Sequence, residues 1–406
     1  MIESPVRIVR RLPRPVQLLV LGSFINKVGT FILPYLALVL RREFGLLPRQ
    51  VALILSAYGI GTLVSILVGG ILTDRLGRRR TLLTSLLGSG ALAVAIAAAP
   101  SLPVFVILLM ALGFLADLYR PAASALIGDA LPSAQRAVGF GALRMAVNLG
   151  FACGMALGGM VADWSWRALF LGDGLTTLLF GLLVYFSIPE PARAAPAPAG
   201  SGQPASPESP WRDPVFLQVA AIAFNFSLVF FSFVTVLPLT ITLAAGYPAR
   251  TYGALMAVNG LLIALLEVSA TQALGGFRRL RVASLGLVLA GLGFGLSGLF
   301  RHWSWFLFSL LVWTAGEILV SPQQQAFVAD WAPPDARGRY MSLFQASWSL
   351  AFVANPLLFI PLHARLGDAA FWPLMPLIIA PGVLLLLRLD RVADQPHLLR
   401  GASGRV

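Results

Sequence analysis

The chain has 406 residues, of which 58% are hydrophobic and only 12% are charged, with a formal net charge of +13. A water-soluble protein of this length needs a far more polar surface, so the composition excludes an ordinary soluble enzyme or binding domain. The positive charge would suit a nucleic acid, but the sequence predicts no soluble domain to present it, and we expect no nucleic-acid partner.

Apolar runs long enough to cross a bilayer follow one another along the whole chain. They should be helices, because a helix satisfies its own backbone hydrogen bonds inside hydrocarbon. The sequence therefore predicts an all-α membrane protein with twelve transmembrane helices. The expected spans are 16–40, 49–73, 81–99, 103–127, 138–162, 166–188, 214–243, 251–275, 281–300, 303–328, 340–362 and 370–389.

The first span contains the only lysine of the chain, Lys27, beside Asn26. Lysine can lose its proton on burial, whereas arginine effectively cannot, so a lysine inside a span suits a functional role. Two roles stay open for Lys27: contact with a substrate, or an internal ion pair with Asp117.

The turn between the second and third spans combines one acid, glycines and several arginines. Its residues are Gly70, Asp74, Arg75, Gly77, Arg78, Arg79 and Arg80. They resemble the motif G-x-L-x-D-R-x-G-R-R of the major facilitator superfamily, whose members are secondary transporters with two six-helix bundles. The resemblance implies that Asp74 is a gate latch that engages the cytoplasmic end of helix 11. Alternatively, the arginines only fix the topology and Asp74 pairs with one of them.

The fourth span holds Asp117 and Arg120, which are one helical turn apart. Each charge costs roughly 2.5 to 3.5 kcal/mol on membrane-insertion scales, so both should be paired or line a water-filled path. In the family that the loop resembles, an arginine in helix 4 is often linked to proton transfer, and Arg120 is the only candidate. Structural pairing and function are both open.

The fifth span carries a stripe of glycines at Gly150, Gly154 and Gly158, followed by Gly159. Such a stripe lets a neighbouring helix approach closely. It resembles G-x-x-x-G-P-x-x-G-G, a motif of antiporters in the same superfamily, with Met155 where proline is expected. A plain packing stripe is the alternative.

The chain contains an internal repeat at an offset of 201 residues. The matched positions are Gly45, Arg49 and Gly59 with Gly246, Arg250 and Gly260, and Pro121, Ala125, Asp129, Pro132 and Arg136 with Pro322, Ala326, Asp330, Pro333 and Arg337. Arg78 and Arg80 likewise match Arg279 and Arg281, whereas Asp74 matches Gly275. The repeat predicts two six-helix bundles in parallel orientation.

The expected organisation is an N-terminal bundle at 1–188, a linker at 189–213, a C-terminal bundle at 214–390 and a tail at 391–406. The linker is rich in Pro, Ala, Gly and Ser, which cannot build a core. About 20 arginines lie in the loops on the side of the termini, against about 7 on the other side. Both termini and the linker should therefore be cytoplasmic, in a bacterial inner membrane.

Two acids of the second half, Glu267 and Glu317, fall inside apolar runs. Glu317 has no basic residue near it in the sequence. Desolvation favours the neutral form of a carboxyl group, as a proton-coupling site requires. Either acid could instead be a neutral side chain that hydrogen-bonds a neighbouring helix. Aromatic residues of the seventh and eleventh spans, which could line an apolar cavity, are Phe216, Phe224, Phe226, Phe230, Phe231, Phe233, Phe344, Trp348 and Phe352.

These observations predict a secondary transporter that exports a small, amphipathic or drug-like molecule in exchange for protons by alternating access. Proton-coupled uptake, or transport of a sugar or amino acid, is the nearest alternative. A polytopic membrane enzyme is not expected, because the sequence shows no catalytic set near a membrane face. We expect a functional monomer in the lipid bilayer without cofactor or metal, since Cys153 is the only cysteine and the three histidines are scattered.

Overall fold

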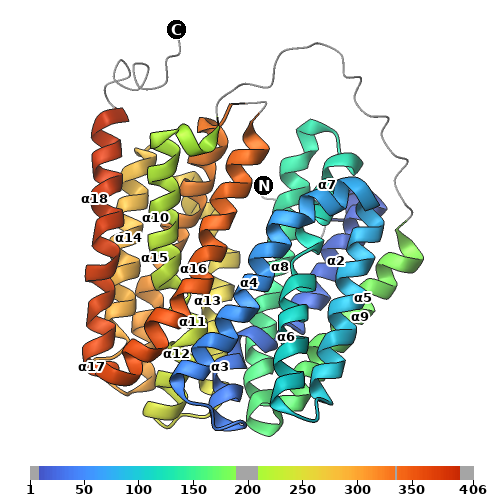
Figure 1. Ribbon diagram of the computed structural model, residues 1–406. Coiled ribbons are helices and arrows are strands. Elements are labelled where there is room, and N and C mark those ends of the chain that lie inside the picture. Colours follow the sequence, from blue (N-terminus) through green and yellow to red (C-terminus); the bar gives the residue numbers. More distant parts are fainter. Residues whose placement is uncertain (1–8, 189–208, 334–335, 394–406) are drawn as a thin grey trace. The chain divides into compact units, whose positions relative to one another are not determined.

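The computed structural model describes residues 9–188, 209–333 and 336–393, which are helical apart from short connections (Figure 1). Twelve helical segments in this described part are long and apolar enough to cross a membrane, which confirms the predicted number of spans. Their bounds are Arg14–Arg42, Pro48–Gly69, Arg78–Ala97, Leu102–Ala130, Val138–Trp164, Trp166–Ser187, Pro214–Ala244, Ala249–Ala273, Arg279–Leu296, Trp303–Trp331, Gly338–Leu366 and Asp368–Arg391.

The chain divides into two compact units, the first formed by Met1–Gly200 and Ile241–Ala264 and the second by Ser201–Thr240 and Leu265–Val406. The first unit contains α2 (Arg14–Val28), α3 (Ile32–Arg42), α4 (Pro48–Leu76), α5 (Arg78–Ala97), α6 (Leu102–Ala116), α7 (Tyr119–Ala130), α8 (Ser133–Trp164), α9 (Trp166–Ser187) and the beginning of α13 (Ala249–Ala273).

The second unit contains the remaining helices. They are the 3-10 turn η1 (Pro210–Arg212), α10 (Pro214–Phe230), α11 (Ser232–Thr235), α12 (Leu237–Leu239), the end of α13, α14 (Arg279–Leu296), α15 (Trp303–Trp331), α16 (Arg337–Leu366), α17 (Asp368–Phe371), the 3-10 turn η3 (Trp372–Leu374) and α18 (Met375–Ala393). A π-helical turn, η2 (Thr240–Ala244), ends the seventh span. The expected boundaries of two bundles and a linker stay a prediction.

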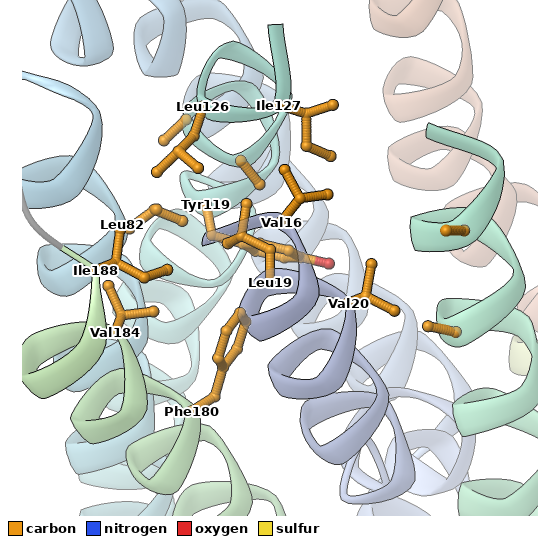
Figure 2. Close-up of a cluster of buried hydrophobic side chains, with 14 of the residues drawn as sticks. Val16, Leu19, Val20, Leu82, Tyr119, Leu126, Ile127, Phe180, Val184 and Ile188 are labelled. Carbon is orange, nitrogen blue, oxygen red and sulfur yellow. The ribbon is translucent and has the colours of Figure 1, made fainter. Parts of the chain in front are cut away.

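A cluster of buried apolar side chains holds α2, α5, α7 and α9 together in the first unit (Figure 2). Val16 and Leu19 of α2 meet Leu82 of α5 and Phe180 of α9, and all four are fully buried. The Phe180 ring lies so close to α2 that a Cβ on Gly22 would be 1.9 Å from its Cδ2 atom. Such close packing fixes the helices that carry the polar groups described below.

Four of the twelve spans are interrupted, although we expected each span to be one helix; the twelfth is interrupted near its start by the 3-10 turn η3. The first span breaks between α2 and α3, where Pro34 has no N–H to offer to the carbonyl of Thr30. The fourth breaks between α6 and α7, because Pro121 cannot bond the Asp117 carbonyl, which instead accepts from the Arg120 N–H at 3.2 Å. The seventh is interrupted at Phe231 and Val236. Such breaks expose backbone polar groups inside a membrane span.

Candidate functional site

The polar site of the first unit surrounds the interruption of the first span. Lys27 lies in the last turn of α2, and its electrostatic partner is Asp173 on α9. The Asp173 carboxylate also accepts a hydrogen bond from the backbone N–H of Ile32, the first residue of α3. A cation at the end of one helix and an anion at the start of the next both complement the helix dipoles. The pair therefore stabilises the broken form of the first span.

A chain of two hydrogen bonds connects the same carboxylate to α2. Asn26 Nδ2 donates to Thr177 Oγ1 at 2.7 Å, and the Thr177 hydroxyl donates to Asp173 Oδ1 at 3.3 Å. Asn26, a predicted candidate, is buried. The sequence analysis missed Asp173. The signal was present, because Asp173 is an acid inside an expected span, the criterion that selected Glu317.

The second charged pair lies at the interruption of the fourth span. Arg120 Nε is 2.8 Å from Asp117 Oδ1, and the Arg120 side chain is 60% exposed while that of Asp117 is 20% exposed. Tyr58 of α4 lies within electrostatic range of Asp117, Arg120 and Asp173. The structure thus pairs Asp117 with Arg120 rather than with Lys27, and Tyr58 interacts electrostatically with members of both charged pairs.

The glycine stripe of α8 packs against the first span next to this site. A Cβ added to Gly150 would lie 2.8 Å from Lys27 Cβ, and one added to Gly154 would lie 2.6 Å from the Lys27 carbonyl oxygen. At Gly158 it would lie 2.7 Å from Phe31 Cδ1. The stripe therefore allows α8 to support the segment on both sides of the break, in keeping with close packing.

The basic turn joins α4 to α5. Gly77 adopts a φ of 95°, which favours glycine. Arg79 donates to the Tyr185 carbonyl at 2.7 Å and lies over the Tyr185 ring. Gly70 and the Asp74 side chain lie outside the described residues, so the latch stays a prediction. Two other arginines of the motif, Arg75 and Arg80, are exposed.

The internal repeat appears in the structure as a repeated ion pair. Arg78 Nε is 3.0 Å from Asp129 Oδ2, and the corresponding Arg279 Nη1 is 2.6 Å from Asp330 Oδ2. Both pairs connect the start of one span with the end of the next span, and both are partly exposed to solvent. The repeat thus preserves a tertiary contact. The side chains of Arg136 and Arg337 lie outside the described residues.

The second unit carries its two predicted acids on separate helices. Glu267 of α13 is 8% exposed, and Glu317 of α15 is partly exposed. Both interact with other groups, so neither is an isolated charge. No group of three His, Cys, Asp or Glu residues within the described ranges has the arrangement of a metal site.

Aromatic rings surround the interruption of the seventh span. The Phe230 ring is 6.0 Å from that of Trp348, and the Phe231 ring is 4.9 Å from that of Phe352, measured between centroids. The Trp348 indole N–H is buried without a hydrogen-bond partner. Phe216, by contrast, packs 4.7 Å from Tyr340, away from this cluster along α10.

The buried Asn355 of α16 forms hydrogen bonds with backbone and hydroxyl groups near the break. Its Nδ2 donates to the Leu228 carbonyl at 2.7 Å and to Ser232 Oγ at 3.2 Å, and its Oδ1 accepts from the Thr235 hydroxyl at 2.5 Å. One amide side chain therefore fixes both sides of the interruption.

A helical membrane protein with interrupted spans and embedded ion pairs has the architecture of a transporter. The family model of the Major Facilitator Superfamily matches residues 19–356 and 277–401, and the chain belongs to this superfamily. It is a multi-pass secondary transporter, as the sequence predicted.

Two curated relatives show what similar chains do. A Na⁺, Li⁺, K⁺/H⁺ antiporter of Planococcus maritimus is 28% identical over 381 residues, covering 85% of this chain and 88% of the relative. The quinolone resistance protein NorA of Staphylococcus aureus is 26% identical over 163 residues, covering 40% and 42% respectively.

Among solved structures, a POT family transporter in complex with 5-aminolevulinic acid superposes with a TM-score of 0.80. The match covers 94% of this chain and 99% of that chain at 15% sequence identity, and it shows a common fold.

Proposed function

We propose that this transporter exports a small amphipathic molecule in exchange for protons by alternating access. The observation that carries the proposal is the Lys27–Asp173 pair at the break of the first span, because it ties a titratable carboxylate to a helix that can change shape. The similarity to an antiporter and to a quinolone resistance protein supports the direction of transport. One proton moving inward supplies about 2.3 kcal/mol per 100 mV.

In this mechanism, a proton that binds Asp173 removes the negative charge held by Lys27 and by the Ile32 N–H. The neutral acid attracts both groups less, so α2 and α3 lose part of what fixes their relative arrangement. Lys27 is then free to interact with a substrate or with another acid. Protonation thereby becomes a change in the shape of the first span, which is the step that coupling requires.

Other charged residues inside the membrane spans are candidates for the same role. We retain Glu317, Glu267, Asp117 and Arg120 as proton-coupling or substrate-contact residues, because charges inside a membrane span are costly unless they function or are paired. Asp74 is the proposed latch on the cytoplasmic face. Asp74→Asn should reduce transport and shift spin-label distances across that face, whereas unchanged values of both would leave Asp74 a topological residue.

The decisive test uses purified protein in proteoliposomes with an imposed inward proton gradient. Substrate-induced proton release is screened first over dyes, antibiotics, sugars and amino acids. Asp173→Asn should then abolish uphill, proton-driven transport and leave downhill exchange. Asp129→Asn, a change of the same kind outside the site, is the matched control. Uphill transport at the unaltered level in Asp173→Asn would contradict the proposal.

The proposed orientation places both termini and residues 189–213 in the cytoplasm. The arginine bias of about 20 against 7 supports it. Reporter fusions in the 99–103 turn and in 189–213 distinguish the two faces. An outward-facing 189–213 segment would reverse the direction assigned to every gate.

A further inference from the structure

Asp163 caps a helix to which it does not belong. It lies in the last turn of α8, and its carboxylate accepts hydrogen bonds from the backbone N–H groups of the first two residues of α13. Oδ1 accepts from Ala249 at 2.7 Å and Oδ2 from Arg250 at 3.1 Å. Both groups belong to the first unit, which includes α13 only as far as Ala264. A carboxylate at a helix N-terminus gains from the hydrogen bonds and from the dipole.

The N-terminus of α13 needs this external cap, as comparison with its repeat partner shows. At the offset of 201 residues, α13 corresponds to α4, which caps itself: the Leu47 N–H donates to Gln50 Oε1 at 2.8 Å. The residues corresponding to Leu47 and Gln50 are Pro248, which has no N–H, and Thr251. The self-capping arrangement is therefore impossible in α13, and Asp163 supplies the acceptor instead.

The surfaces below the cap are shaped to meet closely. A Cβ on Gly253 of α13 would lie 2.4 Å from the Met155 carbonyl oxygen and 2.5 Å from Tyr35 Oη. A Cβ on Gly159, the fourth glycine of the α8 motif, would lie 2.8 Å from Arg250 Cα. Tyr35 donates to the Met155 carbonyl at 2.8 Å. The close approach therefore depends on glycines in both helices.

The position corresponding to Asp163 in the second half is Ala364, so this acid occurs once in the chain. The gate acid Asp74 also occurs once, since its counterpart is Gly275. In the proposed orientation, α8 ends and α13 begins on the extracellular face, opposite to Asp74. Each face would then have an acid of one helix that engages the N-terminus of another helix.

We propose that Asp163 is an extracellular latch, which holds the beginning of α13 on α8 and releases it when the transporter opens outward. The inference rests on the proposed orientation for its assignment to the extracellular face. It does not depend on which molecule is transported. Because Asp163 is exposed to water, its contribution is modest and decreases with ionic strength.

Distance measurements on the full chain test the latch directly. Spin labels at Trp164→Cys and Leu243→Cys, two exposed positions near the ends of α8 and the seventh span, are introduced in a Cys153→Ala background. Asp163→Asn should raise the ratio of long to short distances roughly threefold to tenfold. High salt should shift the unaltered latch in the same direction. Glu43→Gln, which removes an exposed acid at the end of the first span, is the matched control and should have no effect.

A steric variant separates the cap from general damage. Gly253→Ala should also favour the long distance, but without the salt dependence, because its Cβ meets the Met155 carbonyl. A second measurement uses Ala152→Cys in the same Cys153→Ala background. The rate at which an impermeant maleimide labels this cysteine measures its access to water, and the rate should increase in Asp163→Asn. Distances and labelling rates that stay unchanged in Asp163→Asn overturn the proposal. If the unaltered protein shows no proton-coupled transport while Asp163→Asn changes the distances as expected, only the proposed function is contradicted.

Discussion

The first and seventh spans are interrupted at corresponding places, yet the groups around the two interruptions are of opposite kinds. At the repeat offset of 201 residues, Thr30 in the first break corresponds to Phe231 in the seventh, and Lys27 corresponds to Leu228. The first break lies beside Lys27 and Asp173, which attract each other electrostatically, and the seventh lies beside aromatic rings and Asn355. The two halves therefore share the position at which the helix is interrupted, whereas the side chains around that position differ.

The fourth and tenth spans differ in a complementary way. Pro121 and Pro322 are repeat partners, but only the fourth span is interrupted, whereas α15 continues through Pro322. The interruption coincides with the Asp117–Arg120 pair, whose counterparts in α15 are Ile318 and Ser321. A proline alone thus does not decide whether a span breaks, and charged groups accompany the broken one.

The largest expected effect is at the charged break. Lys27→Met should abolish proton-driven transport and lower the yield of folded protein, because the Asp173 carboxylate loses its cationic partner inside a membrane span. Leu228→Met at the corresponding position should leave flux and yield nearly unchanged. The double variant Lys27→Met, Asp173→Asn should recover the yield without coupling. Transport is measured in proteoliposomes, and the yield of folded protein by size-exclusion chromatography in detergent. Full proton coupling in Lys27→Met would show that the charged break does not differ in function from the aromatic one.

Glu317→Gln tests whether the second half also contributes to coupling. The substitution imitates the neutral acid, so we expect normal folding, loss of uphill accumulation and residual downhill exchange. Flux with and without an imposed pH gradient measures these. If the variant accumulates substrate at the unaltered level, Glu317 is structural and coupling belongs to the acids of the first half or to Glu267.

Asn355→Ala should destabilise the aromatic break more than Asn26→Ala destabilises the charged one. Asn355 makes three hydrogen bonds to buried groups, and Asn26 Nδ2 makes one. Leaving the partners of Asn355 unsatisfied should cost about 1–3 kcal/mol of the free energy of unfolding. Thermal unfolding in detergent compares the two variants, and equal shifts would show that Asn355 is not the main support of the seventh span.

The smallest effects should come from the repeated ion pairs. Asp129→Asn and Asp330→Asn each remove a pair that is partly exposed, so each should change the free energy of unfolding by less than about 1 kcal/mol. High salt should diminish both changes. Calorimetric midpoints at two ionic strengths measure this, and a much larger effect at one site would show that the repeat has diverged there too.

The sequence by itself determined the twelve spans, the family and the repeat. These follow from properties of the chain that act locally: the length of apolar runs, glycines that permit a turn at Gly77, and spacing that recurs at Asp129 and Asp330. The position of the Lys27 charge inside a span was also predictable from the sequence, and such a charge is costly unless it is paired or has a function.

Only the tertiary structure decided which charges meet. Lys27 and Asp173 are in the first and sixth spans, and nothing in the spacing of the sequence specifies that α2 and α9 pack together. Partner choice depends on close packing such as that of Phe180 over Gly22, which brings the two helices into contact. The cap of α13 by Asp163 was hidden for the same reason, since a backbone N–H carries no sequence signal until the helix that approaches it is known.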